Sequence, residues 1–172
     1  MNWTDYYDEE YFDGGKGYEK YEYSGQYEQW ADMLIRMFNP KSVLDVGCAK
    51  GFLVKALRER GVPSWGVDIS EYAIANCPEE VSDYLIEWDI TSTKQLELPH
   101  FDLAVSFDTF EHIPKDKLHL AIMFMLNHGN QHYIRVGTPD TPDWQHDKSH
   151  VTIQPIIWWK ELSEIIVFEE SK

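Results

Sequence analysis

The sequence is poor in cysteine and in positive charge. Its 172 residues include only Cys48 and Cys77, which are too few for a disulfide framework and favour a reducing, cytoplasmic location. Lys and Arg together number 15 against 30 acidic residues, for a formal net charge of −15. A nucleic-acid-binding surface needs the opposite sign. We therefore expect no nucleic-acid partner, and a small-molecule or protein partner is favoured.

Long apolar runs are also missing. No stretch approaches the roughly 20 apolar residues of a membrane-spanning helix, and the N-terminus, MNWTDYYDEE, lacks the basic start and apolar stretch of a signal peptide. We expect no membrane segment. With 43% hydrophobic and 26% charged residues, the composition predicts an ordered globular protein with a proper core.

What the chain does contain is an alternation of strand-like and helix-like hydrophobic patterns. Strands are predicted at 42–47, 65–69, 84–89, 101–107 and 132–136, with a terminal strand within 165–170. Helices are predicted at 27–38, 51–60, 70–76 and 114–127, and one more from about 155. Such alternation predicts an α/β fold in which helices cover both faces of a mostly parallel sheet.

The first predicted strand runs into a cluster of small residues and then into a helix, the arrangement that often binds part of a nucleotide-like ligand. The spacing is Asp45-x-Gly47-x-Ala49-x-Gly51, which departs from the G-x-G-x-x-G pattern of dinucleotide sites. A carboxylate at Asp45 would repel a diphosphate but attract a cationic ligand. An NAD-dependent oxidoreductase is therefore disfavoured.

Two more acids stand at predicted strand ends. Asp68 closes WGVDI and Asp89 closes LIEWD, and ligands of open α/β sheets bind at the carboxyl edge of the strands. Three acids at that edge suit a positively charged ligand that carries a ribose diol and an adenine amino group. The structural alternative is that Asp45 only forms hydrogen bonds beside the helix and that Asp68 only caps the helix at 70.

With these pieces in order, the chain resembles a class I S-adenosylmethionine-dependent methyltransferase over roughly residues 40–162, and LDVGCAKG resembles the first motif of that family. The resemblance implies a Rossmann-like, doubly wound fold, and Ala49 replaces the usual middle glycine. It also implies that Asp68 accepts hydrogen bonds from the ribose hydroxyls and that Ile69 flanks the adenine. The full set of implied cofactor contacts is Asp45, Gly47, Cys48, Ala49, Gly51, Asp68, Ile69, Asp89, Ile90, Ser106 and Phe107.

The two ends of the chain differ from this core. Residues 1–30 hold seven of the ten tyrosines and eight acids, and this segment resembles one that folds over the cofactor in small-molecule members. We expect residues 1–39 to form a lid and first helix, the alternative being a mobile acidic arm, and residues 40–172 to form the cofactor-binding domain. Only IIVFEE follows the last helix, so the fold is expected to be truncated at the C-terminal strand pair. Either a homodimer covers that side or the chain ends before its domain does.

Catalysis on such a scaffold needs a base for a hydroxyl or amine acceptor. The candidates are His112, His150 and Asp108, with Glu111 and His146 nearby in the sequence. The spacing of DTFEH resembles a divalent-metal site in some methyltransferases, yet Glu-His here also occurs in metal-free members, and no metal ligand is assigned. The expected function is methyl transfer from S-adenosylmethionine to an oxygen or nitrogen of a small molecule. The alternative is a non-catalytic S-adenosylmethionine-binding or scaffold protein.

Overall fold

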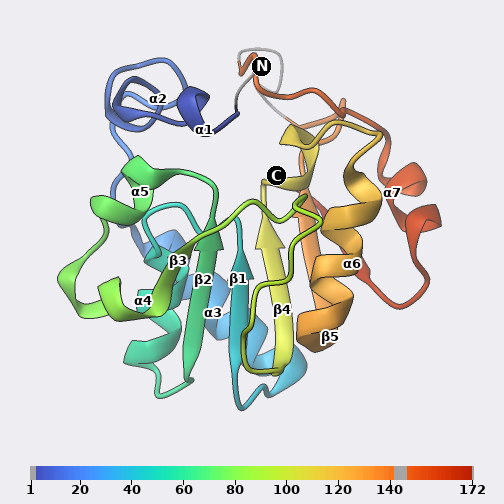
Figure 1. Ribbon diagram of the computed structural model, residues 1–172. Helices are drawn as coiled ribbons and strands as arrows, with labels where there is room; N and C mark the ends of the chain where they lie inside the picture. The colour runs from blue at the N-terminus through green and yellow to red at the C-terminus, as the bar shows by residue number, and fades with distance from the viewer. Residues whose placement is uncertain (1–2, 142–146, 172) are drawn as a thin grey trace.

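The computed structural model describes residues 3–141 and 147–171, which form a six-stranded sheet in the order β3-β2-β1-β4-β5-β6 (Figure 1). Every neighbouring pair of strands is parallel. The strand order reverses between β1 and β4, the position at which open α/β sheets bind ligands. The strands are β1 Val43–Val46, β2 Ser64–Asp68, β3 Leu85–Glu87, β4 Phe101–Phe107, β5 Gly129–Val136 and β6 Val167–Glu170.

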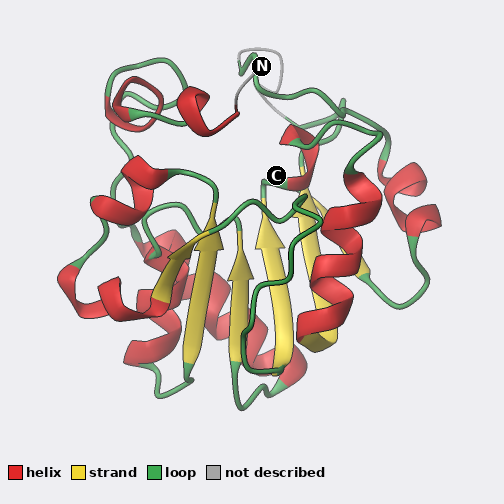
Figure 2. Ribbon diagram, viewed as in Figure 1, coloured by secondary structure: helices red, strands yellow, loops and turns green. Residues whose placement is uncertain are grey.

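Helices occupy both faces of the sheet (Figure 2). On one face, α3 and α4 bury Leu34 and Leu57 against Val43 of β1, and on the other, α6 buries Met125 against Leu44 of the same strand. Successive side chains of β1 point to opposite sides of the sheet, and all four of its residues are buried, so helices cover the strand on both faces. The helices are α1 Trp3–Tyr6, α2 Glu9–Asp13, α3 Gly25–Phe38, α4 Phe52–Glu59, α5 Glu71–Ala75, α6 Leu118–His128 and α7 Ile156–Leu162, with 3-10 turns η1 Glu79–Tyr84 and η2 Phe110–His112.

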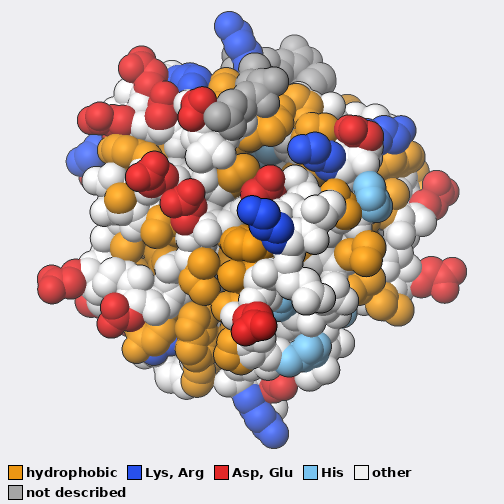
Figure 3. Space-filling view, viewed as in Figure 1, with side chains coloured by type: hydrophobic (Ala, Val, Ile, Leu, Met, Phe, Trp, Pro, Cys, Tyr) orange, Lys and Arg blue, Asp and Glu red, His pale blue; other side chains and the backbone are white. Residues whose placement is uncertain are grey.

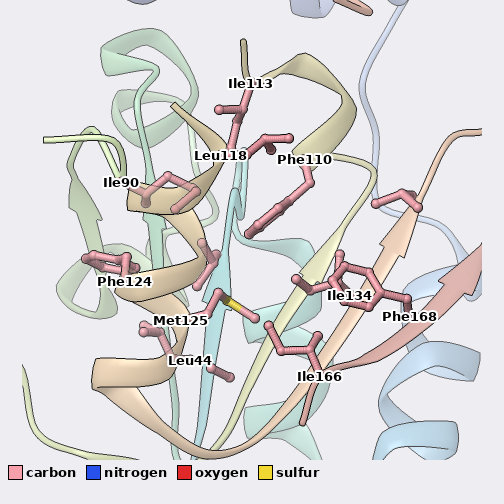
Figure 4. Close-up of a cluster of buried hydrophobic side chains, with 14 of the residues drawn as sticks. Leu44, Ile90, Phe110, Ile113, Leu118, Phe124, Met125, Ile134, Ile166 and Phe168 are labelled. Carbon is pink, nitrogen blue, oxygen red and sulfur yellow. The ribbon is translucent and has the colours of Figure 1, made fainter. Parts of the chain in front are cut away.

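The larger core cluster lies between the sheet and α6 (Figure 4). Leu118 and Met125 of α6 face Ile134 of β5, and Trp159 of α7 is fully buried in the same cluster. Figure 4 shows Phe110 of η2 inserted beside these residues, so the core anchors the turn that follows β4. Packing of Phe110 in the core thus fixes the position of a turn that carries candidate site residues.

The predicted α/β fold is confirmed, with shifts at some element boundaries. Helix α6 begins at Leu118 and not at 114, because the backbone amide of Lys117 donates to the carbonyl of Pro114 and closes a turn first. Strand β5 begins three residues earlier than predicted. The terminal strand is β6, which pairs in parallel with β5. No helix in the described part of the chain has the length and apolar character needed to cross a bilayer.

The N-terminal segment lies over the carboxyl edge of the sheet, where Figure 1 shows α1 and α2 beyond the strand arrowheads. Hydrogen bonds attach it to the sheet domain: for example, Lys50 donates to Asp13 at 2.6 Å, and the Ser70 hydroxyl donates to the carbonyl of Tyr7 at 2.6 Å. Acidic side chains are spread over the face shown in Figure 3, this segment included, in keeping with the net charge of −15.

Candidate active site

A cavity of about 350 Å³ opens at the carboxyl edge of the sheet. Its floor comes from the ends of β1, β2, β3 and β4, and its roof comes from aromatic residues of the N-terminal segment. This size and this mixture of apolar walls with a few polar groups are typical of small-molecule sites.

The loop after β1 is shaped by residues with left-handed backbone angles. Gly47 has φ of 82° and Ala49 has φ of 49°. The amides of Gly47 and Cys48 both donate to the carbonyl of Val67, at 2.8 and 3.0 Å, which draws the loop against β2. A Cβ at Gly47 would collide with the side chain of Thr109. Glycine is therefore required there both for the backbone angle and for space.

Asp68, at the end of β2, connects this loop to the next one. Its carboxylate accepts from the amide of Ala49 at 2.7 Å and from the amide of Ser70 at 2.8 Å. The N-cap of α5 is Ser70, whose hydroxyl accepts from Ala73. Asp68 thus has a structural role, but it also lines the cavity. Each carboxylate oxygen can accept more than one hydrogen bond, so both roles are compatible.

Asp45 is the most unusual acid of the cavity. Its side chain is only 3% exposed, and the described residues supply no hydrogen bond to its carboxylate. Burial, with a further contribution from the charge of Asp68, raises the pKa of Asp45 to about 8. A buried carboxylate of this kind is stabilised either by keeping its proton or by receiving a cation. The cavity therefore presents an acid that suits a positively charged group.

The residues that follow β2 and β3 supply an apolar part of the wall. Ile69, Trp88 and Ile90 line the cavity together with Asp89. The Asp89 carboxylate accepts from the amide and the hydroxyl of Thr91, at 2.8 and 2.7 Å, and so orders the turn after the strand.

Most predicted cofactor residues line the cavity, but two lie outside the lining. Ser106 is fully buried, and its hydroxyl donates to the carbonyl of Val46 at 2.7 Å, which joins β4 to β1. Gly51 faces β3, where an added Cβ would lie 2.6 Å from a methyl carbon of Leu85. Both residues contact neighbouring strands on the side away from the cavity. Their positions therefore favour a structural role over direct contact with a ligand in the cavity.

Asp108 is held in an ion pair. The guanidinium of Arg135 lies 2.5 Å from its carboxylate, and the hydroxyl of Ser171 also donates to it. Arg135 in turn lies 4.4 Å from the centroid of the Trp30 ring. A carboxylate engaged in this way is a weak candidate for a general base, because taking up a proton would disrupt the pair. No sequence pattern points to Arg135, and Trp30 is expected only as part of the amphipathic helix at 27–38.

His112 lines the cavity as a neutral imidazole. Its Nδ1 lies 2.7 Å from the Ser149 hydroxyl, and its ring centroid lies 4.6 Å from that of His150. Burial, with the nearby His150, lowers the pKa of His112 to about 4, so its ring is neutral at pH 7. His150 is beside His112 but is not part of the cavity lining. His146, the other predicted histidine of this segment, lies outside the described residues.

Glu111 completes a cluster behind the cavity wall. One carboxylate oxygen accepts from the amide of Gly137 at 2.7 Å, and the other is buried with no hydrogen-bond partner in residues 3–141 and 147–171. Burial, together with the charge of Asp108, raises the pKa of Glu111 to about 8. Ligand atoms of Glu111, His112 and His150 all lie within 4.8 Å of one another. One carboxylate and two imidazoles form a donor set that a divalent transition metal can use.

The roof of the cavity was predicted only as an aromatic segment, not residue by residue. It consists of Trp3, Tyr7, Tyr11, Phe12, Tyr18, Tyr21, Tyr27 and Trp30. These rings contact one another in edge and stacked arrangements, for example Tyr7 with Tyr11 at 4.8 Å between centroids. The density of tyrosines in the first 30 residues was the signal for this roof.

A parallel sheet of reversing order, with acids at its carboxyl edge and a cavity above them, defines a Rossmann-like nucleotide-binding protein. Residues 21–160 match the methyltransferase domain family. Because the match covers most of the chain, the protein belongs to that family. The resemblance to class I methyltransferases is thereby confirmed for the family and the fold.

Individual relatives are more distant and match only part of the chain. The chain is 32% identical over 93 residues to the O-antigen chain terminator bifunctional methyltransferase/kinase WbdD of Escherichia coli, covering 50% of this chain and 13% of that protein. It is 32% identical over 90 residues to the ubiquinone biosynthesis O-methyltransferase of Pseudomonas fluorescens SBW25, covering 49% of this chain and 38% of that protein. The matches thus span well under two thirds of these relatives.

Solved structures agree on the fold. The SAM-dependent methyltransferase of Archaeoglobus fulgidus superposes with a TM-score of 0.63 at 21% identity, covering 81% of this chain and 68% of that one. The plantazolicin methyltransferase BpumL, solved with SAH, superposes with a TM-score of 0.56 at 16% identity, covering 79% and 60%.

Proposed function

We propose that this protein is an S-adenosylmethionine-dependent methyltransferase that acts on an oxygen or nitrogen of a small molecule. The observation that carries the proposal is the pair of acids at the cavity floor: Asp45, which is buried and receives no hydrogen bond from the described residues, and Asp68, at the end of the neighbouring strand. S-adenosylmethionine carries an amino group and a sulfonium for the first acid and a ribose diol for the second. When bound, this cofactor supplies an activated methyl group.

The remaining lining suits the rest of the cofactor. Asp68 would accept from the ribose hydroxyls, and Ile69 and Ile90 would lie against the adenine. The loop from Gly47 to Ala49 would border the methionine part. We propose residues 1–39 as the segment that covers this site and residues 40–172 as the domain that binds the cofactor, because the aromatic roof comes from the former and the acids from the latter.

His112 is the favoured base. It lines the cavity and is neutral at pH 7. Asp108, another candidate base, is already paired with Arg135. An unprotonated imidazole can take the proton of a hydroxyl or amine acceptor, and general-base groups contribute about 10²- to 10⁴-fold to a rate. The aromatic side chains of the roof offer flat apolar surfaces, which suit a planar acceptor. The names of the ubiquinone-pathway relatives support oxygen as the methylated atom.

The test is a metabolite screen that measures release of S-adenosylhomocysteine. We expect turnover with at least one small-molecule acceptor, lost by a factor of about 10² or more in His112→Ala. The matched control is His119→Ala, because His119 is exposed on α6 outside the cavity. Binding of S-adenosylmethionine without turnover on any acceptor would favour the non-catalytic alternative. Equal activity in His112→Ala and in wild type would remove His112 as the base.

The same assay separates the role of His112 as the base from an alternative role in which Glu111, His112 and His150 bind a metal and His112 takes no proton. The unpartnered oxygen of Glu111 is the observation that favours this second proposal. Loss of activity on chelation, restored by magnesium or manganese, would support a metal that orients the acceptor. Activity that resists the chelator would leave the cluster with a metal-free role.

We also propose that a second copy of the chain covers the outer edge of β6. This strand pairs with β5 alone among the described strands, and Ile165 and Val167 beside its start are exposed to 66% and 46%. Open strand edges are generally covered or protected. Light scattering is expected to give a dimer, and a monomer at all concentrations tested would contradict this assignment.

A further inference from the structure

A chain of hydrogen bonds runs from the N-terminal segment to His112. The hydroxyl of Tyr11 donates to Oδ2 of Asp147 at 2.8 Å, and the hydroxyl of Ser149 donates to Oδ1 of the same carboxylate at 2.5 Å. The backbone amide of Ser149 donates to Oδ1 as well, at 2.8 Å. The Ser149 hydroxyl also lies 2.7 Å from Nδ1 of His112. Ser149 is fully buried, so water does not substitute for these partners.

The protons along this chain can be counted. An ionised carboxylate only accepts hydrogen bonds, and Asp147 is ionised at neutral pH, because burial, which raises its pKa, is outweighed by the hydrogen bonds from Ser149. The single hydroxyl proton of Ser149 is therefore used toward Asp147. The Ser149 oxygen can then only accept from His112, which requires a proton on Nδ1. A neutral imidazole carries one ring proton, so Nε2 has none.

We infer that Asp147 and Ser149 are positioning residues that hold His112 in the Nδ1–H tautomer and leave Nε2 as the nitrogen that receives the acceptor's proton. This inference rests on the proposed function, in which His112 is the base. In that step the acceptor's O–H or N–H bond breaks, its electron pair stays on the acceptor, and the proton forms a bond to Nε2. The resulting imidazolium keeps Nδ1–H directed at Ser149 and later returns the proton from Nε2 to solvent.

The arrangement shares one feature with catalytic triads, in which a buried carboxylate fixes the tautomer of a histidine. Here the serine is placed between the carboxylate and the imidazole, so it transmits orientation and is not a nucleophile. Because Tyr11 belongs to the N-terminal segment, Asp147 is also a point at which that segment contacts the relay. A free histidine in water prefers the other tautomer, so an Nδ1–H form distinguishes His112 from an unconstrained histidine.

The test is the tautomeric state of His112, measured by long-range proton–nitrogen NMR on protein labelled with ¹⁵N-histidine at pH 7.5. The His112 signals are assigned by their disappearance in His112→Gln. In wild type we expect the Nδ1–H pattern for His112. In Ser149→Ala we expect a shift to the Nε2–H form, and in Ser149→Thr, which keeps the hydroxyl, a return toward the wild-type pattern. Ser82→Ala is the control, because Ser82 is exposed and bonds only the carbonyl of Glu79.

The measurement requires neither cofactor nor acceptor, so it can fail or succeed independently of the proposed function. An Nε2–H pattern in wild type would overturn the inference without any variant. A retained Nδ1–H pattern in folded Ser149→Ala would do the same. If Ser149→Ala does not fold, Asp147→Ala replaces it, with the same expected shift, and an unchanged Nδ1–H pattern there would also refute the relay. Calorimetry with S-adenosylmethionine should give Ser149→Ala an affinity within about twofold of wild type, which separates positioning of the base from damage to the cavity.

Discussion

Binding of S-adenosylmethionine should release a proton from Asp45, and Asp45→Asn should abolish that release. In the protein alone, the pKa of this buried carboxyl is about 8, so at pH 7 it is mostly protonated. A cationic ligand beside it favours the ionised form and lowers its pKa toward or below the ordinary value of about 4. The proton is then lost as the ligand binds.

The magnitude follows from the two protonation states. A group with a pKa of about 8 carries about 0.9 proton at pH 7, so binding should release about 0.9 proton per site from Asp45. Between about pH 6 and pH 8 the affinity should rise about tenfold for each pH unit and then level off, because above pH 8 the carboxylate is already ionised. The side chain at position 45 cannot ionise in Asp45→Asn. The affinity of this variant for S-adenosylmethionine should therefore lack this contribution to the pH dependence.

The assay is isothermal titration calorimetry in buffers of different ionisation enthalpy, which gives the number of protons released. Because the ligand and other groups also titrate, the decisive quantity is the difference between wild type and Asp45→Asn. Asp32→Asn is the matched control, since Asp32 is exposed and paired with Arg60 at 2.6 Å on the surface. A difference below about 0.2 proton at pH 7 would refute the reasoning on Asp45.

Further changes test other parts of the account. Asp68→Ala should weaken S-adenosylmethionine binding by about 1.5–3 kcal/mol for each lost charged hydrogen bond, and wild-type affinity by calorimetry would contradict the ribose assignment. In urea titrations, Gly47→Ala should lower the free energy of unfolding by well more than the cost of about 1–2 kcal/mol for left-handed backbone alone. Gly61, with φ of 77°, has open space around it, so Gly61→Ala should show only that smaller cost. Without ligand, Asp45 has a folded-state pKa above its unfolded value, so its contribution to stability is complete below about pH 4 and is lost as pH rises through 8. Wild type should therefore lose up to about 1.4 kcal/mol per pH unit relative to Asp45→Asn between about pH 5 and 8, and parallel stability curves would show that this carboxyl is not buried as described.

The sheet was predictable because its strands have strong local signals. The apolar run ending at Val46 and the alternation of strands with helices fix a parallel sheet, and Asp45 and Asp68 fall at the strand ends where ligands bind. Element boundaries were less predictable. A proline turn delayed the start of α6 by four residues, and such turns depend on local hydrogen bonds that a hydrophobic pattern does not encode.

The partners of Asp108 and His112 could not be predicted from the sequence, because these contacts join segments that are far apart in the chain. Arg135 lies on β5 and reaches Asp108 only because β5 pairs with β4. Asp147 and Ser149 contact Tyr11 and His112 across sequence separations of 136 and 37 residues. Ser106 matched a motif, yet its hydroxyl bonds an adjacent strand, because the alternation of side chains along β4 directs it away from the cavity. Spacing along the chain predicts which strand end a residue occupies, but not which residues become the hydrogen-bond partners of its side chain.

The most direct test of the account is a crystal structure of the protein grown with S-adenosylhomocysteine at saturating concentration. We expect the ligand in the cavity at the carboxyl edge of the sheet, with its ribose hydroxyls on the carboxylate of Asp68. Its adenine should lie against Ile69 and Ile90, and its amino group should lie near Asp45. Ligand density at another place on the molecule, or a ribose directed away from Asp68, would contradict it.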